Sequence, residues 1–251
     1  MNDCNTRENC QDIRTQLREL YTRLANEPDA DFGWGKGKEN SRLLGYAEAW
    51  LNELPDCVWE SAAAVGNPFS LGAVHSGETV IDLGCGAGAD VCVAALLVGD
   101  QGKVFGFDCT PAMVAKAARN ATASHLPQLA VQVAELTALP LSDACADLVI
   151  SNGAINLAAN KNSVAEEIFR ILKPGGRLQI ADMVRDLSAT ESVCGAEAAS
   201  WADCVSGTLS PEVFLDTLRN AGFIDAELVG FTAYRTSPAT IGGLFRAAKA
   251  D

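Results

Sequence analysis

The stretch Val80–Asp90, with the sequence VIDLGCGAGAD, constrains the fold more than any other part of the chain. A short β-branched and apolar run at 79–83 leads into a loop, and an apolar helical pattern follows the loop. That order predicts a buried strand, a tight turn and a helix. The loop holds three alternating glycines: Gly84, Gly86 and Gly88. Glycines let the backbone adopt φ > 0 and approach a ligand closely, and free N–H groups at the helix start point toward that ligand.

Two classes of ligand are bound by loops of this kind. Dinucleotide-binding proteins carry G-x-G-x-x-G/A, a pattern that Gly84, Gly86 and Ala89 satisfy. Proteins that bind S-adenosylmethionine (SAM) carry a similar loop, D-x-G-x-G-x-G, which the three glycines satisfy together with Asp82. Asp82 has a role only in the second class, because a carboxylate can hold an ammonium group but repels a pyrophosphate. The loop therefore favours SAM, with a plain structural turn as the remaining alternative.

Strand and helix patterns alternate after this loop. Strands are expected at 79–83, 104–107, 130–133, 147–151 and 177–183, with two more at 226–234 and 243–249. Helices are expected at 89–98 and 110–124, after a capping box at Ser163, and after Ser210 as N-cap with Pro211 at the first helical position. This rhythm predicts an α/β fold, a parallel sheet with helices on both faces. Such sheets bind ligands at the carboxyl ends of their strands.

The N-terminal part of the chain differs from the rest. Residues 1–64 carry helical stripes and a glycine-rich loop around Trp34, and we expect a helical extension that acts as a lid. Residues 65–251 are expected to form the cofactor-binding domain, with an insertion around 185–210 that borders the acceptor. The fold class predicted is thus Rossmann-like with an N-terminal helical cap.

Composition argues against several classes of protein. The formal net charge is −13 and the sequence pI is about 4.6, which disfavours nucleic acid and anionic membranes as partners. Apolar runs fall short of the roughly 18 residues of a membrane span, and the polar first residues do not resemble a secretory signal. We therefore expect a cytoplasmic protein. Its nine cysteines include no C-x-x-C pair, which argues against a zinc ribbon and a disulfide framework.

Polar residues at the predicted strand ends are candidates for cofactor binding. Asp108 ends the second strand, where a carboxylate accepts hydrogen bonds from two ribose hydroxyls of NAD or SAM. Cys109 and Met113 are placed to pack on an adenine face, although both are equally typical of ordinary core. Glu135 can accept from the adenine amine, or be a surface glutamate. Asn152 ends the fourth strand and borders the site.

In combination, these motifs resemble class I SAM-dependent methyltransferases. The resemblance covers roughly residues 65–251 and rests on the aspartate–glycine loop, on Asp108, and on the segments LPLSDACADLVISN and LKPGG. It implies a seven-stranded, mostly parallel sheet whose last strand is antiparallel. It also implies SAM as cofactor and transfer of its methyl group to a small-molecule acceptor.

Within that class, the sequence most resembles arsenite methyltransferases. The matching segments are GNP, VISNGAINL and WADCVSGTLSPE. The resemblance implies that thiolates, which suit a soft centre such as trivalent arsenic, hold the substrate, with Cys204 at one of three family positions. Cys194 lies ten positions earlier and is a candidate for a second thiolate. Val65 and Gly153 occupy the other two family positions.

The identity of the acceptor therefore stays open from the sequence. One candidate is arsenite or a methylated arsenical, and the other is a small organic or thiol metabolite bound beneath residues 1–60 and 185–210. Outside this activity, the alternatives are a nicotinamide-dependent oxidoreductase and a SAM-binding module without catalysis. The two histidines, His75 and His125, are expected at the surface, so we predict neither a general base nor a metal site.

Overall fold

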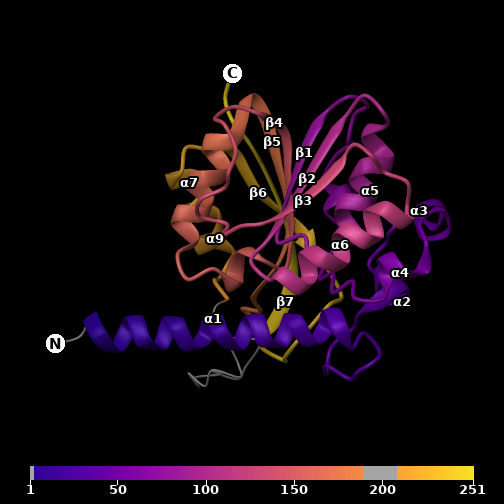
Figure 1. Cartoon of the computed structure of the whole chain (residues 1–251). Coiled ribbons are helices and arrows are strands. Elements are labelled where there is room, and N and C mark those ends of the chain that lie inside the picture. The colour runs from indigo at the N-terminus through magenta and orange to yellow at the C-terminus, as the bar shows by residue number, and fades with distance from the viewer. Residues whose placement is uncertain (1–2, 189–207) are drawn as a thin grey trace.

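A seven-stranded sheet forms the centre of the structure, a computed structural model that describes residues 3–188 and 208–251, with side chains from Arg14 onward (Figure 1). The strand order is β3-β2-β1-β4-β5-β7-β6. The strands are β1 (Thr79–Leu83), β2 (Lys103–Asp108), β3 (Leu129–Val133), β4 (Ala146–Asn152), β5 (Leu172–Arg185), β6 (Ile224–Phe231) and β7 (Thr240–Ala248). Strand β7 runs antiparallel to both of its neighbours, and the other six strands run in one direction. The predicted mostly parallel sheet with an antiparallel last strand is therefore confirmed.

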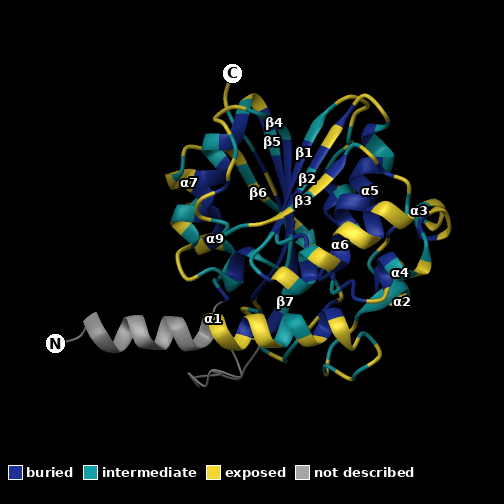
Figure 2. Cartoon of the chain, in the orientation of Figure 1, coloured by how far each residue is buried: buried dark blue, intermediate teal, exposed yellow. Residues whose placement is uncertain are grey.

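Alternating side chains along the central strands build two separate cores. Val80 of β1 packs in one core, whereas Ile81 and Leu83 pack in the other. The first core lies against α5 (Ala89–Val98) and α6 (Pro111–Ala123), and the second against α7 (Lys161–Ile171) and α9 (Pro211–Asn220). In Figure 2 the central strands are coloured as buried, whereas α6 and α7 carry both buried and exposed residues. Because both faces are covered, the central strands β1 and β4 are mostly apolar and buried rather than alternating with exposed polar residues.

Side-chain hydrogen bonds cap the starts of α7 and α9, whereas α5 and α6 begin without such a cap. The Ser210 hydroxyl accepts from the Val213 N–H at 3.4 Å, and Pro211 is the first residue of α9, as predicted. The predicted capping box at Ser163 is wrong, because α7 begins two residues earlier. The Asn160 side chain caps that helix by accepting from the Ser163 N–H at 3.1 Å, which satisfies a free donor of the first turn.

The start of β5 also differs from expectation. The segment LKPGG was expected to end a helix ahead of a strand at 177, whereas β5 already begins at Leu172. Leu172 pairs with Ala146, and the next registered pair is Arg177 with Leu148, so the extra residues form a bulge. A proline and two glycines are tolerated there because a bulge interrupts the regular ladder.

The N-terminal segment lies across the end of the sheet that carries the carboxyl ends of the parallel strands (Figure 1). It contains α1 (Asp3–Asn26), α2 (Gly37–Leu43), α3 (Glu48–Glu53) and α4 (Asp56–Trp59), and two 3-10 helices lie further on, η1 (Pro68–Leu71) and η2 (Ile155–Leu157). Leu24 of α1 packs with Met113 of α6 in a small cluster of its own. The lid role of residues 1–64, on a separate domain formed by residues 65–251, stays a prediction. Most of the predicted insertion, residues 185–210, lies outside the described residues. In the described ranges, none of the helices has the length and apolar character to span a bilayer.

The central strand β4 should be far more sensitive to truncation than the surface of α2. Leu148 is fully buried in β4, whereas Leu43 is 78% exposed. We expect Leu148→Ala to lower the free energy of unfolding by about 2–5 kcal/mol, because it removes apolar contacts and leaves a cavity. The matched change Leu43→Ala should alter it by less than about 0.5 kcal/mol. Urea unfolding followed by circular dichroism measures both, and equal losses would contradict this core assignment.

Candidate active site

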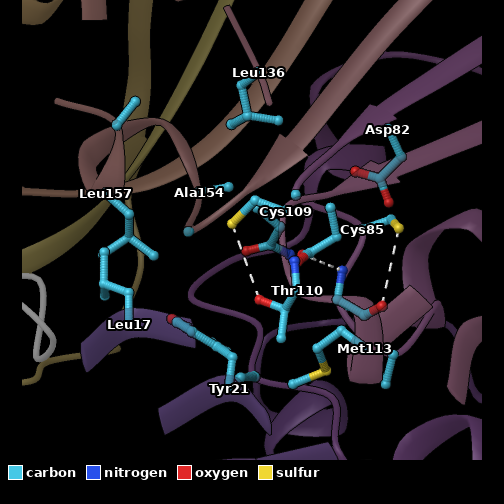
Figure 3. Close-up of a pocket in the computed structure, with 18 of the residues that line it drawn as sticks. Leu17, Tyr21, Asp82, Cys85, Cys109, Thr110, Met113, Leu136, Ala154 and Leu157 are labelled. Atoms are coloured by element: carbon cyan, nitrogen blue, oxygen red, sulfur yellow. Dashed lines mark hydrogen bonds between the residues drawn. The ribbon is translucent and has the colours of Figure 1, made fainter. Parts of the chain in front are cut away.

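A cavity of about 650 Å³ opens at the carboxyl ends of β1, β2 and β4, beneath α1. The glycine loop forms one wall, and Leu17, Tyr21 and Leu24 of α1 line the opposite side. Figure 3 shows Leu17 and Tyr21 facing the loop residues across this space. The predicted location, at the strand ends of a parallel sheet, is therefore where the structure has its cavity.

Each loop glycine has a positive φ, and each has different surroundings. A Cβ on Gly84 (φ +75°) would lie 2.1 Å from the Ala154 Cβ, and a Cβ on Gly88 (φ +93°) would lie 2.9 Å from the Ala117 Cβ. Both glycines are therefore required by packing. Gly86 (φ +50°) faces open space, since a Cβ at this position would have no heavy atom of the described residues within 4 Å. Its missing side chain leaves room for a ligand.

Asp108 is held against the loop by backbone hydrogen bonds. One carboxylate oxygen accepts from the Thr110 N–H at 2.8 Å and the other from the Gly86 N–H at 3.1 Å. Burial raises the pKa of Asp108, and these hydrogen bonds oppose that shift. The predicted ribose-binding carboxylate and the glycine loop thus form one rigid unit.

Asp82 is the least satisfied polar group of the cavity. Its side chain is only 2% exposed, and its Oδ2 atom has no hydrogen-bond partner among the described residues. Burial raises the pKa of Asp82 well above its ordinary value, and repulsion from Asp90 and Asp108 adds to the shift. Buried polar atoms almost always have partners, so this oxygen indicates a binding site for a donor from a ligand.

A second buried carboxylate, Asp90, was not among the residues predicted from sequence. It lies in the first turn of α5, where one oxygen accepts from the Tyr46 hydroxyl at 2.6 Å and the other from the Asn152 Nδ2 at 2.9 Å. The Asn152 Nδ2 also donates to the Gly66 carbonyl at 2.9 Å, and its Oδ1 accepts from the Val65 N–H at 3.0 Å. An acid within the apolar run ADVCVAALLV was the signal available in the sequence.

The remaining predicted cofactor residues also line the cavity. Met113 is fully buried, and Cys109 is half-buried with a pKa raised by burial. Glu135 lies at the mouth, where it pairs with Arg18 of α1 at 2.9 Å and with Arg14 at 3.7 Å. The cavity is therefore lined by every cofactor-binding residue expected from the sequence except Gly88, and Glu135 at its mouth is paired with the N-terminal helix.

Gly153 lines the cavity, and Val65 lies beside it. A Cβ on Gly153 (φ +70°) would be 3.3 Å from Val65 Cγ1. The Val65 backbone is fixed on both sides, since its carbonyl accepts from the Thr232 hydroxyl at 2.8 Å and its N–H donates to Asn152. These two positions thus touch each other, whereas Cys194 and Cys204 lie outside the described residues.

Asp182 is a further buried acid that the sequence did not single out. It is fully buried in β5 and accepts from the N–H groups of Ile155 (2.9 Å) and Asn156 (3.2 Å), from the Asn156 side chain (3.0 Å) and from its neighbour Met183 (2.7 Å). Burial raises its pKa to about 6. Its role is to hold η2, which follows Gly153 and borders the cavity.

Comparison with known proteins assigns the family. Residues 74–222 match the family model described as "Methyltransferase domain", and the chain belongs to this family. Its sequence is similar to arsenite methyltransferases of Halobacterium salinarum (37% identical over 188 residues, 75% of this chain and 48% of that protein) and of Aquipseudomonas alcaligenes (34% over 195 residues, 72% and 55%). The chain spans about half the length of these curated relatives.

Solved structures agree with the sheet and its surroundings. An arsenic(III) S-adenosylmethionine methyltransferase from Chlamydomonas reinhardtii superimposes with a TM-score of 0.61 at 28% identity, covering 86% of this chain and 75% of that chain. A SAM-dependent methyltransferase from Aquifex aeolicus has a TM-score of 0.57 at 23% identity, covering 72% and 90%. The second likeness concerns the fold alone.

Two loop glycines should respond differently to alanine. Gly84→Ala places a methyl group on Ala154, so we expect a loss of at least about 2 kcal/mol in the free energy of unfolding. Gly86→Ala meets only open space and should lose about 1 kcal/mol, the cost of a left-handed alanine. Urea unfolding of the two variants measures the difference, and a larger loss for Gly86→Ala would contradict the loop packing.

Proposed function

We propose that this chain binds SAM and transfers its methyl group to a small-molecule acceptor. The observation that carries the proposal is the buried Asp82 carboxylate, whose Oδ2 has no partner among the described residues, beside a glycine loop with space for a ligand. A cationic ligand satisfies such an oxygen, and SAM carries both an ammonium and a sulfonium group. A dinucleotide fits poorly, because its pyrophosphate would face the buried acids Asp82 and Asp90.

Each predicted cofactor residue then has a chemical role. Asp108 receives the ribose hydroxyls, Asp82 the ammonium group, and the Gly86 backbone lies against the ligand. Cys109 and Met113 offer apolar contact to adenine, and Glu135 offers an acceptor for its amine. These residues come from three strand ends and one helix, so the fold, rather than one flexible loop, orients the cofactor.

The site supports methyl transfer by positioning and desolvation. Bound SAM supplies a methyl group on a positively charged sulfur, open to attack in line. Leu17 and Leu24 of α1 line the cavity and would lie against the bound cofactor, which lowers its contact with water. His75 and His125 are exposed and do not belong to the cavity lining of the described structure, so an acceptor that needs no general base is favoured.

We infer that the acceptor is a soft nucleophile, either trivalent arsenic or a small thiol. The similarity to proteins named arsenite methyltransferases supports arsenic. The Val65–Gly153 contact supports the alternative, since these positions offer no thiolate. A place of action in the cytoplasm, without nucleic acid or membrane as partner, accords with the net charge of −13.

Isothermal titration calorimetry with SAM tests the cofactor. We expect wild type to bind SAM and its demethylated product, and Asp108→Ala to bind both about 10–100-fold more weakly, because hydrogen bonds to a charged group are lost. Asp216→Ala removes an exposed acid of α9 and should bind as wild type does. Absence of SAM binding by well-folded wild type would overturn the proposed function.

A screen of arsenite, a methylated arsenical and small thiols, read by release of the demethylated cofactor, tests the acceptor. If Cys204 holds arsenic, Cys204→Ser should lose arsenical methylation by at least about tenfold while thiol methylation continues. Cys145→Ser is the matched control, since Cys145 precedes β4 at the opposite end of the sheet from the cavity. Unchanged arsenical turnover in Cys204→Ser would exclude that thiolate as an arsenic ligand.

A further inference from the structure

Asp90 is a buried acid on a helix that is otherwise apolar. It is 8% exposed, and the other residues of α5 are alanine, valine, cysteine and leucine. Removal of a carboxylate from water is costly unless a partner compensates it. The partners of Asp90 in the described structure, Tyr46 and Asn152, are neutral donors. Folding alone therefore does not account for a charge at this position.

The two donors hold the Asp90 carboxylate in one orientation. Tyr46 precedes the glycine loop by about 40 residues in the chain, and Asn152 ends β4. The two donors also contact each other, because the Asn152 Nδ2 donates to the Tyr46 hydroxyl oxygen at 3.1 Å. The Gly66 carbonyl lies within reach of both side chains, 3.4 Å from the Tyr46 hydroxyl and 2.9 Å from the Asn152 Nδ2. Burial, followed by the charge of Asp90, raises the pKa of Tyr46 well above its ordinary value, so its hydroxyl stays a donor.

Asp90 and Asp82 line the same cavity and repel each other. The titratable groups that face this pair are Asp108, Tyr46 and Cys85, and each is neutral or negative. The cationic side chains that line the cavity, Arg14 and Arg18, pair with Glu135 at its mouth. The two buried carboxylates are therefore complementary to a ligand that carries two positive centres.

We propose that Asp90, positioned by Tyr46 and Asn152, acts with Asp82 to recognise the sulfonium charge of SAM and so to favour SAM over its demethylated product. This inference rests on the proposed function. During transfer, a lone pair of the acceptor forms the new bond to the methyl carbon, and the electrons of the breaking S–C bond go to sulfur. The sulfonium becomes a neutral thioether, so the cavity keeps two carboxylates for one remaining ammonium group, which weakens product binding.

The test compares three ligands by calorimetry in wild type and Asp90→Asn. The ligands are SAM, S-adenosylhomocysteine, and sinefungin, which has a protonated amine in place of the sulfonium. We expect Asp90→Asn to bind SAM and sinefungin about tenfold or more weakly, and to bind S-adenosylhomocysteine within about threefold of wild type. Equal weakening of all three ligands would overturn the inference, because it would show that Asp90 only supports the fold.

Two control variants distinguish a loss of sulfonium recognition from a general loss of binding or of folding. Asp108→Asn should weaken all three ligands equally, because each has the same ribose. Tyr46→Phe keeps the Asp90 charge, so it should keep a preference for SAM if the variant folds, as urea unfolding without ligand will show. If wild type binds neither SAM nor its product, the proposed function fails. If wild type binds both and Asp90→Asn leaves their ratio unchanged, only this inference fails.

Proton release gives a readout that does not depend on turnover. Because the pKa values of Asp82 and Asp90 are raised in the free cavity, a cationic ligand lowers them and expels protons, and affinity for SAM should rise with pH. Calorimetry in buffers with different ionisation enthalpies should show more protons released by SAM than by S-adenosylhomocysteine. In Asp90→Asn that difference should shrink, and an unchanged difference would contradict the role of Asp90.

Discussion

The contact between the loops that follow β1 and β4 sets the geometry of the site. The two strands are parallel neighbours, so their loops emerge side by side. A Cβ on Gly84 would lie 2.1 Å from the Ala154 Cβ, and only glycine lets the loops close to this distance. As a result, Asp82, the first turn of α5 and Asn152 all face one cavity, which no single element could build.

Three acidic side chains, Asp82, Asp90 and Asp108, line the cavity, and their removal from water lowers the stability of the free protein. Hydrogen bonds from neutral donors satisfy both oxygens of Asp90 and of Asp108, whereas one oxygen of Asp82 has no partner in the described residues. A buried carboxylate without a charged partner costs several kcal/mol. Residues that weaken the free protein can persist where a cationic ligand completes the site. This relation links the packing of the fold to the proposed binding of a sulfonium cofactor.

Residues at strand ends were predictable because strand ends are visible in the chain. Asp82 and Asp108 each follow an apolar run, and parallel strands bring such ends to one edge. Asp90 follows the glycines in a position where acids commonly stabilise a helix start, so its sequence context suggested no further role. Asp182 lies inside an apolar strand, and its function became evident only from the three hydrogen bonds that it accepts from η2.

The sequence by itself determined the glycine loop, the alternation of strands and helices and the strand-end acids, because these depend on backbone freedom and on burial patterns within a few residues. Only the tertiary structure decided that Tyr46 reaches Asp90, that Val65 touches Gly153 and that Asp82 keeps an unpartnered oxygen. Those contacts join segments up to 88 positions apart in the chain, and their distances follow from how two cores pack against one sheet.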